Sequence, residues 1–379
     1  MKIIILGTAH PYRGGLASFN ERLAIQFLNE GHETEIRTFT MQYPGFLFPG
    51  KTQFTLNPSP KGIKISRVLN SVNPLNWIKT GRDIKKEGPD ILIIKYWNPF
   101  MAPAFGAVAR IVRKNKKTRV ICIFDNVISH ERKFGESFLT AFFTGSIDGA
   151  IVMSKSVGAD LSRFRVNIPV NYNPHPLFDN YGVQLSEIEA LKKLNLHEDY
   201  SYLLFFGFIR EYKGLDILLE AFSDTRLRNR NLKLIVAGEF YEDEGPYKEI
   251  ARKNNLGEEV IFFDRYINED EVAAFFSVAD IVVQPYKSAT QSGVTQIAYQ
   301  YEKPMLVTSV GGLSELVPDG KCGYVVNPEP NAIAEAIIDF YNNDRKNQFL
   351  DGIKVQKEKF TWDKLTGSIL DIYHRSVKN

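Results

Sequence analysis

The chain has 379 residues, 44% of them apolar and 24% charged, a composition typical of a folded protein long enough for two domains with full cores. Its net charge of +3 is too small for a general nucleic-acid binder, so we expect no nucleic acid as a partner. Cys122 and Cys322 lack the spacing of metal ligands, and no apolar run approaches the length that spans a bilayer, so we expect a cytoplasmic protein.

Short apolar runs alternate with helical patterns through the first half of the chain. The predicted strands are residues 3–6, 91–94, 120–123 and 150–153, and the clearest helical patterns are 16–29 and 103–112. Such alternation is typical of a parallel sheet that helices cover on both faces. Neither pattern persists through the Asn- and Pro-rich residues 171–179, so we predict a first domain over residues 1–172.

Residues 7–15 join the first predicted strand to the first helical pattern. Their glycines do not have the G-x-G-x-x-G spacing that binds dinucleotides, which argues against a nicotinamide-dependent dehydrogenase. Gly14 and Gly15 at a helix start allow a ligand to approach backbone N–H groups, although glycines also simply permit tight turns. We favour contact with a ligand, because the segment follows the carboxyl end of a strand.

Residues 41–51 are apolar and aromatic but are interrupted by Pro and Gly, so they cannot form a regular core helix. Trp77 and four cations follow downstream, and the cations are Lys79, Arg82, Lys85 and Lys86. Two interpretations remain open. Either this part of the first domain makes a peripheral contact with an anionic membrane, or its aromatic side chains pack back onto the domain.

The alternation resumes in the second half of the chain. The predicted strands there are residues 202–206, 232–236, 260–263, 281–283, 305–307 and 324–326. We therefore predict a second α/β domain over residues 173–360. Residues 361–379 have helical spacing and are expected to form a closing helix that completes the first domain.

Residues 206–214 join a buried apolar run to a helical pattern that begins after Gly214. A helix that begins there directs unpaired backbone N–H groups and the positive end of its dipole into the loop. Arg210 and Lys213 add two full positive charges. The loop therefore suits a phosphate group, although a solvated pair of charges on an ordinary βα loop would give the same pattern.

A second anion-receptive helix start is predicted at Ser292 and Gly293, after the strand that closes with residues 284–286. Open α/β sheets bind ligands at the carboxyl ends of their strands, where both of these starts are expected. Two such starts in one domain, one of them with Arg210 and Lys213, favour a diphosphate over a lone carboxylate. A nucleotide-sugar donor carries that group.

The order of these loops resembles the retaining GT-B glycosyltransferases of group 1. The shared features are the glycine pair at 14–15, the loop at 207–214, residues 236–239, the Lys-Pro pair at 303–304, residues 310–315 and the glycines at 320 and 323. The resemblance covers nearly the whole chain and is denser in its second half. It implies an α/β fold with two doubly wound, Rossmann-like domains that face each other across a cleft.

The resemblance also implies a function. It implies transfer of a sugar, of the hexosyltransferase class, from a nucleotide diphosphate sugar to a glycan or lipid-linked acceptor with retained anomeric configuration. It implies neither a bound metal nor another cofactor. We therefore expect a cytoplasmic bacterial enzyme of surface polysaccharide or glycoconjugate biosynthesis, peripheral at the inner membrane face if the membrane interpretation of residues 41–51 holds.

Matching the chain to the family motifs assigns candidate site residues. The predicted catalytic residues are Arg210, Lys213, Asp125 and His130. The predicted donor-binding residues are Gly14, Gly15, Gly207, Glu239, Tyr266, Gln291, Ser292, Gly293, Val294 and Thr295. The predicted acceptor-side residues are His10, Arg13 and Asn126, and no metal site is predicted. If these residues had no role in a site, His130 would simply lie at the start of a helix, and Glu239 and Tyr266 would be ordinary residues at the ends of strands.

Two departures from the family pattern bear on activity. The arginine usually found directly after the first glycine of the 207–214 loop is Phe208 here. Arg210 would supply its charge, because a shift of two residues in an extended segment keeps the same face. The family's pair of glutamates is also missing. The matching positions are Ala289 and Ile297, or Thr290 and Ala298, depending on a one-residue gap.

These departures keep a second class of function open, a GT-B-shaped protein that binds sugar nucleotides or serves as a partner subunit with weakened transfer. A sugar-nucleotide epimerase, which also uses two such domains, is a third alternative. The acidic run at residues 242–244 looks like the metal motif of other glycosyltransferases. We interpret it as an exposed loop, because the GT-B resemblance calls for no metal.

Overall fold

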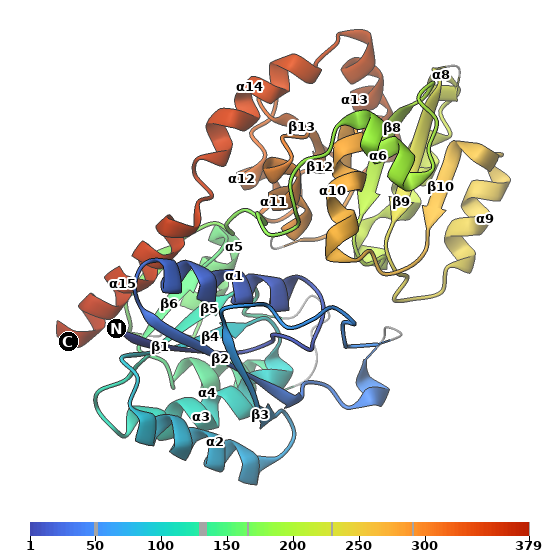
Figure 1. The fold of residues 1–379 in the computed structure, drawn as a ribbon. Coiled ribbons are helices and arrows are strands. Elements are labelled where there is room, and N and C mark those ends of the chain that lie inside the picture. Colours follow the sequence, from blue (N-terminus) through green and yellow to red (C-terminus); the bar gives the residue numbers. More distant parts are fainter. Residues whose placement is uncertain (49–51, 129–134, 165–166, 229, 290–291, 379) are drawn as a thin grey trace. The chain divides into compact units, whose positions relative to one another are not determined.

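The computed structural model describes residues 1–48, 52–128, 135–164, 167–228, 230–289 and 292–378. The chain forms two compact units, each with its own parallel sheet (Figure 1). The first unit is Met1–His175 together with Thr361–Asn379, and the second is Pro176–Phe360. The division falls after His175, within the Asn- and Pro-rich segment, whereas the sequence places it after residue 172.

The sheet of the first unit has seven parallel strands in the order β3-β2-β1-β4-β5-β6-β7. The strands are β1 (Lys2–Leu6), β2 (Glu33–Met41), β3 (Lys64–Asn70), β4 (Ile91–Tyr96), β5 (Arg119–Phe124), β6 (Gly149–Val152) and β7 (Val170–Tyr172). The predicted strands β1, β4, β5 and β6 are nearly continuous apolar runs, because helices bury both faces of the central sheet. The sequence does not predict β2, β3 and β7, since polar residues interrupt the apolar ones in these strands, which lie toward the sheet edges.

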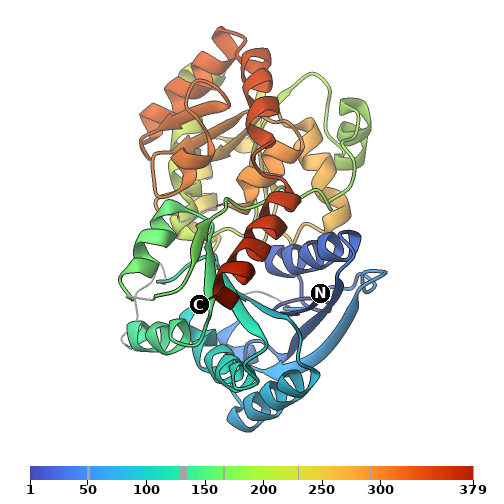
Figure 2. The same ribbon diagram turned by 90° about the vertical axis from the view of Figure 1, so that its left-hand side faces the viewer.

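Helices cover both faces of this sheet (Figures 1 and 2). They are α1 (Gly15–Asn29), α2 (Pro74–Glu87), α3 (Ala102–Arg113), α4 (Glu136–Thr144), α5 (Lys155–Ser162) and α15 (Trp362–Lys378), with the 3-10 helices η1 (Gly45–Leu47) and η2 (Pro99–Met101). Helices α2, α3 and α4 share one core, which includes the fully buried Phe105 and Phe143. Helices α1 and α15 lie side by side on the other face (Figure 2), where a Cβ built on Gly149 would lie 2.2 Å from Ile372. The closing helix therefore packs into the first unit.

The second unit has six parallel strands in the order β10-β9-β8-β11-β12-β13, and all six predicted strands are present. The strands are β8 (Ser201–Phe206), β9 (Leu232–Ala237), β10 (Val260–Phe263), β11 (Ile281–Gln284), β12 (Met305–Thr308) and β13 (Gly323–Val326). The helices are α6 (Glu187–Leu194), α7 (Leu215–Phe222), α8 (Thr225–Arg228), α9 (Gly245–Lys253), α10 (Glu269–Val278), α11 (Gly293–Gln300), α12 (Leu313–Leu316), α13 (Pro330–Asn342) and α14 (Lys346–Lys357), with the 3-10 helices η3 (Glu211–Lys213) and η4 (Gly257–Glu259).

Each sheet reverses its strand order once, between β1 and β4 in the first unit and between β8 and β11 in the second. Loops that leave two neighbouring strands in opposite directions separate at such a point and open a crevice at the carboxyl ends of the strands. In the second unit these are the loop that carries Arg210 and Lys213 and the loop that leads to α11. The two loops that are predicted to bind an anion therefore follow neighbouring strands, β8 and β11.

Candidate functional site

Arg210 lies in the loop after β8. Ile209, beside it, is fully buried, and its N–H donates to a backbone carbonyl just after β9 at 2.9 Å. The neighbours of Ile209 therefore point to the other side of the loop. Phe208 stacks on Tyr241 with ring centroids 4.3 Å apart, and the guanidinium carbon of Arg210 lies 5.1 Å from the centre of the same ring. Phe208 and Arg210 share one face, which is the arrangement that their two-residue spacing predicts.

Lys213 is buried at the end of the same loop, with 8% of its surface exposed. Its Nζ lies 5.6 Å from the centre of the Tyr286 ring, in the loop after β11. A Cβ built on Gly207 would lie 3.0 Å from that Nζ and 3.6 Å from Cγ2 of Val294, in the first turn of α11. The ammonium group, Gly207 and the start of α11 therefore meet at the switch point of the sheet.

The side chain of Lys213 is buried, and its surroundings disfavour its positive charge. Burial and the nearby charge of Arg210 lower the pKa of Lys213 to about 7. Over the residues that the structure describes, no carboxylate forms an ion pair with it, whereas the neighbouring Lys287 pairs with Asp216 at 2.7 Å. Because a buried charge is unfavourable until it is paired, this arrangement favours an anionic ligand.

The start of α11 is held by side chains from the surrounding loops. The hydroxyls of Ser292 and Tyr286 are 3.2 Å apart, and a Cβ built on Gly293 would lie 3.0 Å from the ring of Phe178. Thr295 is fully buried, and its hydroxyl donates to the amide oxygen of the last residue of β11 at 3.1 Å. Ser292 makes no side-chain capping hydrogen bond to this helix. The surrounding side chains therefore hold the first turn of α11 in place, and its N-cap residue, Ser292, contributes no capping hydrogen bond.

Gly214 ends the loop after β8 and lies against the backbone of the loop after β11. Its φ is +68°, and a Cβ at this position would lie 2.0 Å from the carbonyl oxygen of Pro285. We expect Gly214→Ala to destabilise the second unit by about 3 kcal/mol, because a backbone collision adds to the cost of a left-handed conformation. Hydrogen exchange of β8 and β11 measures the loss.

Gly320 provides the matched control for Gly214→Ala. Its φ is +69°, and nothing lies within 4 Å of the position that a Cβ would take. In Gly320→Ala only the left-handed backbone conformation is unfavourable, so we expect a loss of stability of about 1 kcal/mol. Equal losses for the two variants would contradict the close packing of the two loops.

Glu239 and Tyr266 follow β9 and β10. Glu239 is 2% exposed, and its carbonyl accepts the hydrogen bond from Ile209. The ring of Tyr266 stacks on Phe208 with centroids 6.0 Å apart. The loops after β8, β9 and β10 thus meet in a group of three aromatic rings beside Arg210, with Phe208 between Tyr241 and Tyr266. The contribution of Tyr241 is not predicted from the sequence. The predicted site residues His130 and Gln291, and also Thr290, lie outside the described residues.

Three of the four positions that match the missing glutamates lie among the described residues, and these three are apolar and buried. Ala289, Ile297 and Ala298 are 7%, 5% and 0% exposed. On the same helix Gln296 is fully buried, and within the described ranges neither its amide oxygen nor its amide nitrogen has a hydrogen-bond partner. The described part of α11 thus carries neutral amide and hydroxyl groups, and no carboxylate.

Asp125, in the first unit, lies directly after β5 and forms a buried ion pair with Lys95 of β4. The Lys95 Nζ is 2.8 Å from the Asp125 carboxylate and 3.3 Å from the centre of the Phe19 ring, and Lys95 is 1% exposed. Burial lowers the pKa of Lys95, and the carboxylate of Asp125 opposes that shift. The Asp125 carboxylate is thus engaged by Lys95. This partner is not predicted above, although a single lysine in an isoleucine-rich strand is a signal for a buried ion pair.

The remaining candidates of the first unit lie near the end of β1. Gly14 has a φ of +95° and precedes Gly15, the first residue of α1. A ring nitrogen of His10 lies 3.1 Å from the carbonyl oxygen of Asn57, and the Arg13 N–H donates to a backbone carbonyl at 3.0 Å. Asn126 follows Asp125 and is half-buried. The structure therefore places His10 and Arg13 on the loop after β1 and Asn126 after β5.

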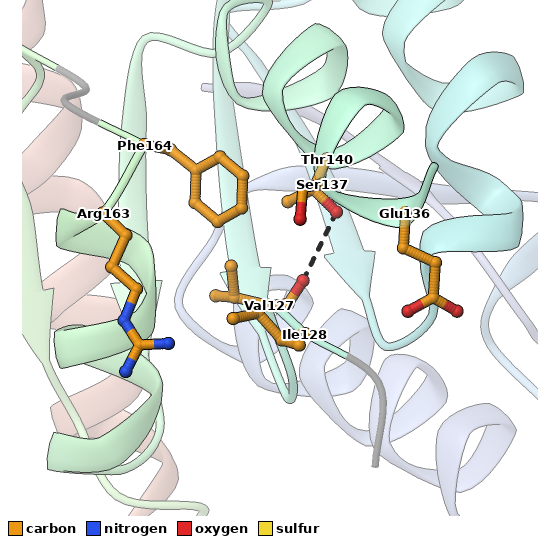
Figure 3. A pocket seen from close by; sticks show the side chains of 7 residues that line it. All are labelled: Val127, Ile128, Glu136, Ser137, Thr140, Arg163 and Phe164. Carbon is orange, nitrogen blue, oxygen red and sulfur yellow. Dashed lines mark hydrogen bonds between the residues drawn. The ribbon is translucent and has the colours of Figure 1, made fainter. Parts of the chain in front are cut away.

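A pocket of about 410 Å³ opens in the first unit beside the residues that follow Asn126 (Figure 3). Its walls are Val127, Ile128, Glu136, Ser137, Thr140, Arg163 and Phe164. The carboxylate of Glu136 and the guanidinium of Arg163 lie on opposite sides, with Phe164 and two hydroxyl groups between them (Figure 3). An aromatic face combined with charged and hydroxyl groups suits a polar ring-shaped ligand.

The acidic run at residues 242–244 has local partners. Tyr247 donates to Glu242, Asp243 accepts from the N–H of Gly245, and Glu244 pairs with Lys248 at 2.7 Å. In the described ranges no group of three or more potential metal ligands comes together. Likewise, none of the described helices is both long enough and apolar enough to cross a membrane.

Comparison with known proteins adds a family match. Residues 186–351 match the model of the family described as glycosyl transferases group 1. The chain is 32% identical to an uncharacterized glycosyltransferase of Methanocaldococcus jannaschii over 177 residues, which cover 46% of this chain and 48% of that protein. It is 28% identical to the D-inositol 3-phosphate glycosyltransferase of Streptomyces coelicolor over 275 residues, which cover 69% of this chain and 58% of that protein. The chain thus spans about half the length of these curated relatives.

The solved structures include a similar fold over the full length. The structure of Anabaena HepE in complex with UDP aligns with a TM-score of 0.74 and 14% identity, and the alignment covers 98% of this chain and 99% of that one. At this identity the likeness concerns the fold, with its two doubly wound α/β units.

Proposed function

We propose that the chain, whose residues 186–351 match the model of the group 1 glycosyl transferases and whose fold is GT-B, transfers a sugar from a nucleotide diphosphate sugar with retained anomeric configuration. The observation that carries the proposal is the buried ammonium of Lys213, which lies beside the start of α11 without a carboxylate partner in the described chain. The HepE structure, which holds UDP, supports a nucleoside diphosphate as the matching ligand.

We propose that Lys213 and Arg210 stabilise the diphosphate as it departs. Negative charge grows on the leaving oxygen while the bond to the sugar breaks, and fixed positive charges lower the energy of that state more than the energy of the bound donor. Arg210 is held over Tyr241, so its guanidinium needs little reorganisation. The first-turn amides of α11 add a positive dipole end. The two side chains supply the charge, so the proposal calls for no metal ion.

We propose that the first unit holds the acceptor, a glycan or a lipid-linked sugar. The pocket lined by Glu136, Arg163 and Phe164 supports this, because it combines an aromatic face with hydrogen-bonding groups. Asn126 lies directly before the first of the pocket's walls. Asp125 would act through its ion pair with Lys95, which fixes the start of this loop, and so would be a positioning residue.

The test is a transfer assay on the purified protein with UDP-, GDP- and ADP-sugars and a panel of glycan and lipid-linked acceptors. We expect one donor class to be consumed, and proton NMR of the product to show the anomeric configuration of the donor. Inversion would contradict the retaining mechanism. Donor conversion into an isomeric sugar nucleotide without an acceptor would support an epimerase.

A second candidate function rests on the apolar residues at the positions of the family's glutamates. Ala289, Ile297 and Ala298 offer no charged acceptor to the sugar or ribose hydroxyls. A protein of this kind would bind sugar nucleotides and act as a sensor or partner subunit. Calorimetric binding of a donor, without turnover across the whole acceptor panel, would favour it over the transferase.

A further inference from the structure

We propose that the first unit docks on an anionic lipid bilayer through the exposed face of α2. This α2 face consists of Leu75, Ile78, Lys79, Arg82 and Lys86. Residues three and four apart along a helix lie above one another, so these five side chains form one stripe. Apolar residues begin the stripe and cations complete it.

The cations of α2 find no counterion in the described ranges of the chain. Lys79, Arg82, Lys85 and Lys86 form no ion pair with any carboxylate that the structure describes. Glu87, at the end of the helix, is engaged by Arg37 at 2.8 Å, so it does not neutralise them. Asp83 is the remaining acidic residue of the helix, which leaves an excess of positive charge. Such an excess is attracted to a negatively charged surface.

The apolar members of the stripe are exposed to water. Leu75 is 78% exposed and Ile78 is 38% exposed, and Val72, just before the helix, is 46% exposed. Ser71 donates to the carbonyl of Met41 at 3.0 Å, which joins this edge to the end of β2. Aliphatic side chains beside unpaired cations on one surface mark an interaction site.

The orientation of α2 is fixed by its opposite face. Thr80, Gly81 and Ile84 are buried, and a Cβ built on Gly81 would lie 2.9 Å from Ile111 of α3. Trp77 also faces inward, since its indole N–H donates to the carbonyl of Asn70 at 2.7 Å. Of the two interpretations that the sequence leaves open, packing therefore applies to this aromatic ring, while the cations and aliphatic residues remain outside.

This combination fits a bilayer better than a nucleic acid. Lysine and arginine side chains reach anionic headgroups while neighbouring aliphatic side chains enter the acyl boundary. A phosphate backbone would use the cations but would leave Leu75 and Ile78 in water. The negative surface of a cytoplasmic leaflet offers both partners.

The test uses the full chain and vesicles of phosphatidylcholine with and without phosphatidylglycerol, in the absence of donor and acceptor. We expect co-sedimentation with the anionic vesicles only, weakening as salt is added. The variant Lys79→Gln/Arg82→Gln should lower the partition coefficient by about 30-fold, about fivefold for each cation. Leu75→Ser/Ile78→Ser should lower it by about tenfold and leave the salt dependence unchanged.

The matched control is Lys192→Gln/Lys354→Gln, which removes two exposed cations from the second unit and should bind as the parent does. Three results would overturn the proposal: no binding by the parent, equal binding by the α2 variants and the control, or unchanged binding after loss of the aliphatic pair. The last result would indicate a general polyanion site. Because all of these residues are exposed and outside the donor site, a failed docking test leaves the transfer assay interpretable.

Discussion

We expect the Lys213→Met variant to transfer sugar about 100- to 1,000-fold more slowly than the parent protein, which corresponds to about 3 to 4 kcal/mol of lost transition-state stabilisation. Methionine keeps the length of the side chain and removes the charge beside Gly207 and the start of α11. Turnover of donor at saturating acceptor is the measurement. Transfer at the parent rate would show that the leaving group is not held there.

Lys287→Met is the control for this variant. Lys287 belongs to the loop after β11, but its ammonium pairs with Asp216 at 2.7 Å, so its loss should change turnover little. Stability separates the two variants further. Lys213→Met should raise the free energy of unfolding of the second unit by about 1 to 3 kcal/mol, because it removes a buried cation for which the described part of the chain offers no counterion. A variant that is more stable and less active cannot have lost activity by misfolding.

We expect Asp125→Asn to destabilise the first unit by about 3 to 5 kcal/mol, because it leaves the ammonium of Lys95 buried without a counterion. Lys95→Met should also destabilise the first unit, because it removes the cation that pairs with the Asp125 carboxylate. The double variant, with neither charge, should be more stable than either single variant. Urea unfolding followed by tryptophan fluorescence measures this unit alone, since the chain's three tryptophans, Trp77, Trp97 and Trp362, all belong to it.

The same cycle tests the function assigned to Asp125. If its carboxylate only positions the loop through Lys95, the double variant should recover most of the activity that the single variants lose. Losses of stability that simply add would show that the two groups are independent. A stable but inactive double variant would instead indicate that Asp125 touches the reacting sugar.

Much of the fold follows from sequence pattern because central strands of a helix-covered parallel sheet are nearly continuous apolar runs. That rule finds all six strands of the second unit but misses β2, β3 and β7, where polar residues interrupt the apolar ones. The meeting of Lys213 with the start of α11 also follows, because the loops after β8 and β11 both line the crevice at the switch point of the sheet.

Contacts between residues distant in sequence could not be predicted in the same way. The ion pair of Lys95 and Asp125 depends on the pairing of β4 with β5, and Tyr241 reaches Phe208 only because β8 and β9 are neighbours. The sequence shows that the glutamates are absent, whereas the burial of Ala298 and Gln296 depends on how α11 packs against the rest of the second unit.

If the second unit binds a diphosphate at Lys213, its affinity for a nucleoside diphosphate should weaken between pH 7 and pH 9. Burial holds the pKa of Lys213 at about 7 in the free protein, and a bound diphosphate must raise it. Binding then takes up a proton above pH 7, where the diphosphate itself is fully ionised. The dissociation constant should therefore rise by up to about tenfold per pH unit for the parent and stay flat for Lys213→Met. Equal affinities with the same pH dependence in both proteins would show that Lys213 does not bind the diphosphate.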